Sequence, residues 1–528
     1  MSRNFSTPGR SAVHAAHGMI ATSHPLASAV GLKVLTEGGS AVDAAIAATA
    51  MLSMAEPQMT GIGGDCFALV SADGSTDITA INGSGRAPAA ASVDALKAAG
   101  LTDEIPRNSP HAVTVPGAVD AWWAMHQRFG TLGWDRLLWP AVAYAEDGIA
   151  VHERVARDWA LHVANVTGDT DATAQYLNAG RAFTAGELFS QQRLADALRE
   201  IQRNGRDGFY KGAVMEDMVS KLRKIGGLHE EADFTTTASE FVSPIATEVY
   251  GHKIWECPPN GQGVAALILL RLLERFDLAA MDEADRIHVH AEATKIAYHI
   301  RDELVADPVF AQTPVDGLLD AGYIDKLEAT IDKKKAAQPV ASDFPDHPHT
   351  IYLAVVDRNG MAVSMINSIF DDFGAGISTP EYGVLFHSRG KAFRLVDGHP
   401  NMIEGGKRPM HTIIPGMISR GDALIGPFGV MGGQYQAAGH GMLISRILGL
   451  GLNPQEALDA PRSFAHAGVL QLEEGYDSDI AAALTARGHV LDYPFGPIGG
   501  GQAILRNPDT GVMTAGSDPR KDGIAIGY

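Results

Sequence analysis

The sequence is poor in cysteine and in positive charge. Only two of its 528 residues are cysteines, Cys66 and Cys257, too few for a disulfide framework, so nothing in the chain requires an oxidising compartment. Lysine and arginine number 42 against 62 aspartates and glutamates, which gives a formal net charge of −20. A protein that follows nucleic-acid phosphates needs the opposite sign, at least locally. The composition therefore excludes nucleic acid as an expected partner.

Long apolar runs are also missing. The first six residues lack the apolar core of a signal peptide. The longest clean apolar run, residues 264–270, is far shorter than the roughly 20 residues that span a membrane. We expect a soluble, cytoplasmic protein with a large core and no membrane partner.

An exposed connector leads directly into a predicted β-hairpin. Residues 332–349 are charged, contain proline and carry almost no large apolar side chain, which is typical of an exposed loop. Residues 350–356 have strand propensity, and residues 361–368 form the predicted return strand. The turn between them contains Asn-Gly, which readily adopts positive φ angles. The first residue of this hairpin is Thr350.

A threonine in this position can be a nucleophile. Its hydroxyl needs a base, and its own α-amine can serve once the preceding peptide bond is cut. An α-amino group has a pKa of about 7.7–8.0, so part of it is neutral at cellular pH. Cleavage between His349 and Thr350 would create this group. On pattern alone, a threonine that opens a strand is usually only a β-forming residue.

Other catalytic motifs are incomplete. The chain has no G-x-S-x-G sequence for a serine hydrolase, and residues 61–65 lack the third glycine of a dinucleotide fingerprint. Ser388 and Lys391 fit S-x-x-K, but no K-T-G accompanies them. Cys66 follows a double glycine, where a small buried residue is expected more often than a nucleophile.

The histidines do not form a metal-binding pattern. His288 and His290 are two residues apart in a helical segment, so their rings diverge. His347 and His349 have no acidic or cysteine companion at ligand spacing. We predict neither a metal nor an organic cofactor.

Short motifs in a fixed order cover nearly the whole chain. They occupy residues 18–27, 38–45, 56–64, 115–117, 258–263, 291–293, 350–376, 432–433 and 517–523. In this order they resemble the γ-glutamyltranspeptidase family of N-terminal nucleophile (Ntn) hydrolases. The resemblance implies an α+β fold, a four-layer αββα sandwich, made by a precursor that cuts itself.

The same resemblance implies two subunits from one precursor. Residues 1–349 would form the large (α) subunit and residues 350–528, 179 residues, the small (β) subunit. Together they would make one αββα domain. Whether the αβ unit pairs further into a dimer is left open.

The resemblance also implies the catalytic residues. Thr350 falls at the nucleophile position, and Ser368 where a second hydroxyl bonds to the nucleophile. Gly432 and Gly433 match the pair whose backbone N–H groups line the oxyanion hole. Glycine suits that role because it lets the backbone approach the developing negative oxygen.

The chain departs from the family where the family binds an amino-acid head group. Ala392 replaces the aspartate that pairs with the substrate α-amine, so a buried α-ammonium would lack its counter-ion here. We therefore expect γ-glutamyl compounds to be poor substrates. The other replacements are Ser84 for an arginine, Phe370 for an asparagine, Arg389 for a glutamine and His411-Thr412 for a pair of serines.

The remaining pocket suggests a small anion. Phe370 narrows it, Thr412 lines it, and Arg86, Arg389 and His411 are predicted to offer charge, since a guanidinium can bind a carboxylate through two hydrogen bonds. Surface ion pairs are the alternative role for both arginines.

We expect an amidohydrolase acting on a small anionic amide, foremost oxamate, which would yield oxalate and ammonia in purine degradation. A γ-glutamyltransferase or glutathione hydrolase and an acylase of dicarboxylic-acid amides remain alternatives. A different class, an unprocessed binding protein that keeps the fold, also remains open.

Overall fold

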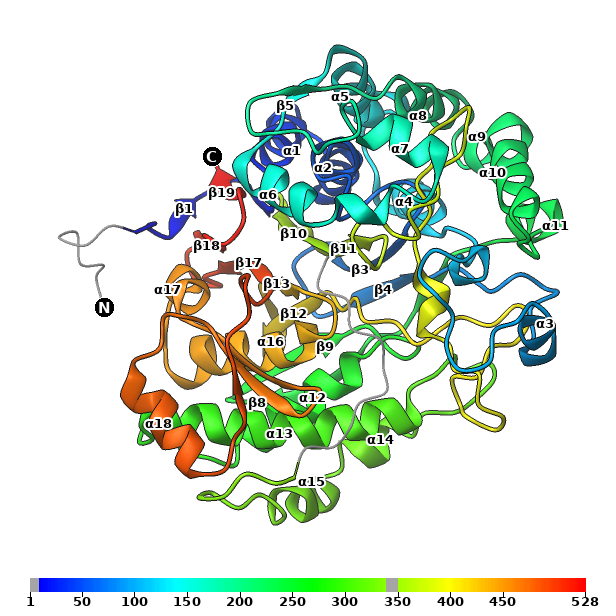
Figure 1. Ribbon diagram of the computed structural model, residues 1–528. Helices are drawn as coiled ribbons and strands as arrows, with labels where there is room; N and C mark the ends of the chain where they lie inside the picture. The colour runs from blue at the N-terminus through cyan, green and yellow to red at the C-terminus, as the bar shows by residue number, and fades with distance from the viewer. Residues whose placement is uncertain (1–8, 339–349) are drawn as a thin grey trace.

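Two seven-stranded antiparallel sheets form the centre of the molecule (Figure 1). The computed structural model describes residues 9–338 and 350–528; His349 and residues 339–348 of the predicted connector lie outside this range. The first sheet has the order β1 (Val13–Ala15), β18 (Met513–Ser517), β17 (Gly500–Arg506), β13 (Ala423–Met431), β12 (Gly416–Arg420), β9 (His252–Glu256) and β8 (Ile245–Val249). The second has the order β19 (Ile524–Gly527), β2 (Met19–Thr22), β10 (Ile351–Val356), β11 (Ala362–Ser368), β3 (Asp65–Ser71), β4 (Ile78–Gly83) and β7 (Glu240–Val242).

Helices cover the outer face of each sheet. On the second sheet pack α1 (Pro25–Thr36), α2 (Ala41–Ala55) and α4 (Ala118–Phe129), with α5 (Trp134–Asp147) packed on α2 and α8 (Gln192–Asn204) on α5. On the first sheet pack α12 (Gly263–Leu273) and α16 (Tyr435–Ile444), with α13 (Glu283–Leu304) packed on α12. Every residue of α2 is buried, which explains its alanine-rich sequence, since small side chains let a helix lie close to a sheet and to its neighbours. The predicted αββα sandwich is confirmed.

Apolar side chains fill the space between the two sheets. Tyr352 and Phe67 of the second sheet meet Met417, Met431 and Ile504 of the first, and all five are buried. Strands from before residue 339 and from after residue 349 occur in both sheets. The described chain is therefore one sandwich and does not divide into separate domains at the connector.

The predicted β-hairpin is confirmed. Strands β10 and β11 pair antiparallel from Ile351 opposite Asn367 to Val356 opposite Ala362. This register places Thr350 directly across from Ser368. Strand β3 pairs with β11 on its other side, with Asp65 opposite Ser368. Asp65, Thr350 and Ser368 thus lie side by side at the ends of three central strands of the second sheet.

No helix in the described part of the chain combines the length and the apolarity needed to cross a bilayer.

The turn of the hairpin is attached to α2 by one carboxylate. Asp357 is buried; its Oδ2 accepts a hydrogen bond from the N–H of Ala41 (3.0 Å), and its Oδ1 accepts from the N–H groups of Asn359 (2.8 Å) and Met361 (3.1 Å). We expect Asp357→Ala to lower the free energy of unfolding by about 2 kcal/mol, because three backbone donors lose their acceptor. Denaturant titration measures this change. Asp422→Ala, at an exposed turn of the other sheet, is the matched control and should leave stability unchanged. Equal effects of the two variants would contradict the role given to Asp357.

Candidate active site

Thr350 lies in a buried group of hydrogen-bonding side chains. Its Oγ1 is 3.2 Å from Oγ of Ser368. The same Ser368 oxygen accepts from the N–H of Phe370 (3.0 Å) and from Nη2 of Arg389 (3.4 Å). A hydroxyl oxygen has two lone pairs and one proton, so with both lone pairs engaged the Ser368 proton points to Thr350 Oγ1. Ser368 is therefore placed to donate to Thr350 Oγ1.

Phe370 has an unusual backbone that serves this contact. Its φ angle is +76°, a region that bulky residues rarely adopt and that costs on the order of 1–3 kcal/mol. This conformation lets the Phe370 N–H reach Ser368, while its ring lies 4.3 Å from the central guanidinium carbon of Arg389. The structure thus brings together Phe370, Ser368 and Arg389, as predicted from sequence.

Arg389 is completely buried beside Ser368. Its Nη1 donates to Oγ1 of Thr412 (3.3 Å), and its Nε lies 3.5 Å from Oδ2 of Asp65. Burial lowers the pKa of the guanidinium to about 10, against the opposing effect of Asp65. Arg389 is therefore a cation at neutral pH, and Thr412 shares its environment.

Asp65 is the counter-ion that the sequence reasoning missed. Its Oδ2 lies 3.0 Å from Nε2 of His411 and 3.2 Å from Nδ1 of His387, and its Oδ1 accepts from the N–H of Gly85 (3.0 Å). Burial alone would raise the pKa of Asp65, but the two histidines hold it well below its usual range. The sequence showed Asp65 only as the end of an incomplete glycine motif, and His387 drew no attention at all. Their meeting depends on strand register and on a loop more than 300 residues away.

The positive charge predicted for His411 is wrong. Burial, with the repulsion of Arg389, lowers the pKa of His411 to about 3, so the ring is neutral at pH 7. Its Nδ1 accepts from the N–H of Ile413 (3.3 Å), which leaves the proton on Nε2, facing Asp65. His411 therefore supplies a hydrogen bond and no positive charge.

The structure also corrects the predicted role of Arg86 as a charge in the pocket. Its guanidinium pairs with Glu240 (2.8 Å) and Asp307 (3.4 Å) and donates to the carbonyl of Gly406 (2.9 Å). These contacts match the ion-pair role that was the alternative, and they leave Arg389 as the cation beside Thr350.

Gly432 and Gly433 lie between the end of β13 and the start of α16. Their φ angles are +132° and +57°, and a Cβ on Gly432 would lie 2.9 Å from Cα of Gly499, so a side chain does not fit. Their carbonyls accept from the N–H groups of Tyr435 and Gln436 in the first turn of the helix. The positive end of the helix dipole therefore lies at this pair, which suits an oxyanion.

Comparison with known proteins decides the family. The family model described as Gamma-glutamyltranspeptidase matches residues 27–528. The chain belongs to this family. It is an amidohydrolase of the Ntn type, and the family expected from the sequence motifs is confirmed.

Several relatives cover the chain almost completely. It is 33% identical over 525 residues to the glutathione hydrolase-like YwrD proenzyme of Bacillus subtilis, covering 96% of this chain and 98% of the relative. It is 32% identical to the oxamate amidohydrolase proenzyme of Klebsiella pneumoniae, covering 97% and 98%. The crystal structure of a cephalosporin acylase from Bacillus halodurans superposes with a TM-score of 0.94 at 37% identity, covering 100% and 99%.

The buried side chain of Arg301 helps to hold the segment that contains Gly432 and Gly433. Nη1 of Arg301 donates to the side-chain oxygens of Gln262 and Gln434, both at 2.7 Å. Gln262 in turn donates to the carbonyl of Thr412 (2.7 Å). One network therefore fixes both the residue after Gly433 and the residue that contacts Arg389. The sequence reasoning gave no role to Arg301 or Gln262.

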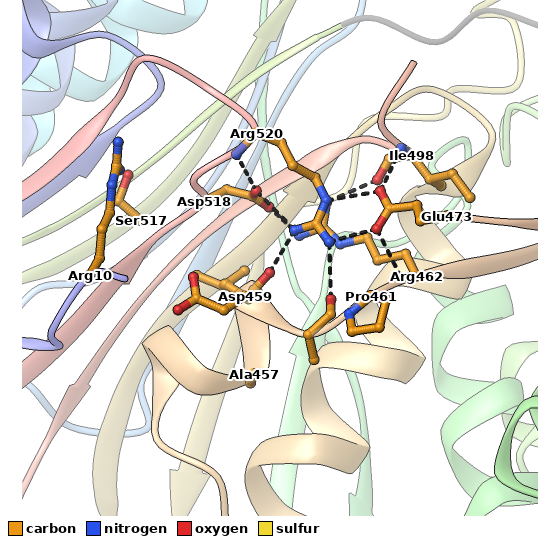
Figure 2. Close-up of polar contacts among 12 residues, drawn as sticks. Arg10, Ala457, Asp459, Pro461, Arg462, Glu473, Ile498, Ser517, Asp518 and Arg520 are labelled. Carbon is orange, nitrogen blue, oxygen red and sulfur yellow. Dashed lines mark hydrogen bonds and ion pairs between the residues drawn. The ribbon is translucent and has the colours of Figure 1, made fainter. Parts of the chain in front are cut away.

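The C-terminal motif of residues 517–523 supplies a second support (Figure 2). Nε of Arg520 donates to Glu473 (2.8 Å), and its Nη1 lies 3.3 Å from Asp518, which also pairs with Arg462. Two cations and two carboxylates thus compensate one another in a largely buried cluster. This arrangement makes it structural, because no charge is left for a ligand.

This cluster holds the segment of Ile498 and Gly499, which lies against Gly432. The carbonyl of Ile498 accepts from Arg462 (2.9 Å), and its N–H donates to Glu473 (2.9 Å), as Figure 2 shows. Ile498 precedes Gly499, whose backbone touches Gly432. The position of the glycine pair therefore depends on the C-terminal motif.

The other candidate motifs have structural roles. Ser388 and Lys391 both contact Asp371, at 2.8 and 3.3 Å. Cys66 is buried in β3, and burial raises the pKa of its thiol, which disfavours a nucleophilic thiolate.

One group in the described residues has the spacing of metal ligands, His288, Glu292 and His489. Nδ1 of His288 is hydrogen-bonded to Nε2 of His489 (2.8 Å), and Glu292 accepts from Lys295 (2.7 Å). The lysine already supplies a positive charge there. His290 points elsewhere, to a backbone carbonyl, so the predicted divergence of the two rings is confirmed.

Asp65 can be tested as the counter-ion of Arg389. We expect Asp65→Asn to lower the free energy of unfolding by about 3–5 kcal/mol, because it leaves a buried cation uncompensated. The double variant Asp65→Asn/Arg389→Met should recover part of this loss, since the cation is then absent. Denaturant titration of the four proteins gives the coupling. Strict additivity would show that the two charges do not depend on one another.

Proposed function

We propose that the chain is a precursor that cuts itself between His349 and Thr350 and then hydrolyses a small anionic amide, foremost oxamate. The observation that carries this proposal is the buried Arg389 cation, separated from the Thr350 hydroxyl by Ser368 alone. A carboxylate next to the scissile amide would meet this cation while the amide carbon lies at Thr350. An oxamate amidohydrolase proenzyme that is 32% identical over almost its whole length supports the choice.

The proposed reaction uses the chain's own groups. Thr350 Oγ1 bonds to the amide carbon, and its proton passes to the α-amine of Thr350. The oxygen of the tetrahedral intermediate is held by the N–H groups of Gly432 and Gly433. The C–N bond then breaks, and the α-amine gives its proton to the departing nitrogen. Water next cleaves the acyl ester, releasing the acid and restoring the hydroxyl.

Selectivity follows from the charges around the nucleophile. The Arg389 guanidinium attracts an anionic acyl group, and the Phe370 ring covers one side of it. The buried methyl group of Ala392 offers no counter-ion to an α-ammonium. An amino-acid head group is therefore disfavoured relative to a simple anionic one. The similarity to the cephalosporin acylase structure keeps an acylase of longer dicarboxylic-acid amides as the second candidate.

Thr350→Ala tests the nucleophile. We expect this variant to remain one chain of 528 residues and to be inactive, whereas the unchanged protein gives fragments of 349 and 179 residues. Denaturing gel electrophoresis and intact mass measure both outcomes. Thr350→Ser is the matched control, because it keeps a hydroxyl and should still be cut. Hydrolysis by the alanine variant would place the nucleophile elsewhere.

A substrate panel tests the specificity. We expect kcat/KM of the cut enzyme to be highest for oxamate, lower for glutaryl amides and about 10²-fold lower for a γ-glutamyl anilide, because a buried unpaired ammonium is strongly disfavoured. Arg389→Met should lower kcat/KM for oxamate by a similar factor. Preference for the γ-glutamyl compound would contradict the argument from Ala392, and preference for the glutaryl amide would favour the acylase.

A further inference from the structure

A cleft of about 250 Å³ opens beside Gly432. One wall is α6 (Glu153–Leu161) with His162, and the other is the segment 494–499, which ends at Gly499. Ligand pockets usually measure about 300–1,000 Å³, so this cleft suits a group the size of one substituted ring. Gly432 lines this cleft and also belongs to the proposed oxyanion site, so the two lie side by side.

The cleft is lined by aromatic rings. Tyr435 and Phe464 are nearly buried and meet edge to face, with ring centroids 5.4 Å apart. Phe495 lies at the rim and is 86% exposed. A phenylalanine held so far into solvent loses the benefit of burial unless something covers it. These three rings offer a planar apolar group contacts on several sides.

A cation stands at the same rim. Arg157 is 38% exposed at its side chain and lies 3.5 Å from Asp158, while its Nη2 donates to the carbonyl of Phe495 (3.2 Å). Asp158 is more closely bound by Arg154, whose Nε lies 2.8 Å from both carboxylate oxygens. Arg157 is thus the weaker partner of a shared carboxylate, and its guanidinium can accept an additional anion.

We propose that, for substrates whose amide nitrogen is substituted, this cleft binds the leaving amine, and that the favoured amine of this kind carries an aromatic ring with a carboxylate. The proposal rests on amide hydrolysis at Thr350. Besides the carbonyl oxygen, the scissile carbon carries the anionic acyl group and the nitrogen. The acyl group is directed to Arg389, so the nitrogen faces another wall, and the cleft beside Gly432 has room for its substituent. When the C–N bond breaks, the ring amine departs with the proton from the α-amine. The ring packs on Tyr435 and Phe464, and its carboxylate pairs with Arg157.

Binding of the amine alone tests the cleft independently of catalysis. The probe is 3-aminobenzoate, added to the cut enzyme and followed by titration calorimetry or ligand-observed NMR. We expect a Kd of about 1 mM, typical of a ring-sized fragment. Arg157→Gln and Phe495→Ala should each weaken binding about fivefold. Tyr493→Ala is the matched control, since Tyr493 is another exposed aromatic residue two positions away that does not line the cleft. No binding, or equal loss in the control, would overturn the proposal.

Turnover separates failure of the cleft from failure of the proposed function. The substrates are oxamate, its N-phenyl derivative and its N-(3-carboxyphenyl) derivative, and the readout is the ratio of their kcat/KM values. We expect the ratio of N-phenyl derivative to oxamate to fall about fivefold in Phe495→Ala. The advantage of the added carboxylate should disappear in Arg157→Gln. Hydrolysis of oxamate without either change would refute the cleft alone, whereas binding of 3-aminobenzoate without hydrolysis of any amide would refute the proposed function alone.

Discussion

A cation buried beside Ser368 requires an anion buried with it. Arg389 has no exposed surface, and the carboxylate that compensates it is Asp65. Asp65 is the first residue of β3, which pairs with β11. This requirement explains the rest of the local arrangement. His387 Nδ1 and His411 Nε2 lie 3.2 and 3.0 Å from Asp65 Oδ2, and the Gly85 N–H donates to Asp65 Oδ1. Without Asp65 the guanidinium would be an uncompensated buried charge within reach of Ser368.

The strand ends that carry Thr350 and Ser368 were largely predictable from the sequence. Asn-Gly between two apolar runs predicted the hairpin, and its register places Thr350 opposite Ser368. The glycine pair and the αββα fold followed from the family resemblance. A local pattern was sufficient for the hairpin, because it is encoded by residues close together in the chain, whereas the fold and the glycine pair required motifs spread over the whole chain.

The electrostatics of the site could not be predicted in the same way. The sequence does not distinguish the roles of Arg86 and Arg389. Only tertiary contacts show that Arg86 pairs with Glu240 and that Arg389 lies beside Ser368. His411 lost its predicted charge because burial sets its pKa. Asp65 was missed because its partners come from distant loops. Burial and pairing depend on the whole fold, and a single sequence does not display them.

The strand order has a consequence for how the two halves stay together. Strands β10 and β11, which follow residue 349, lie in the middle of the second sheet, between β2 and β3, which precede it. Removing residues 350–528 would cut that sheet in two and leave unpaired backbone at both new edges. The halves of a cut molecule therefore have no folded state apart from one another. Dissociation and unfolding become the same event, so dilution alone should not separate them.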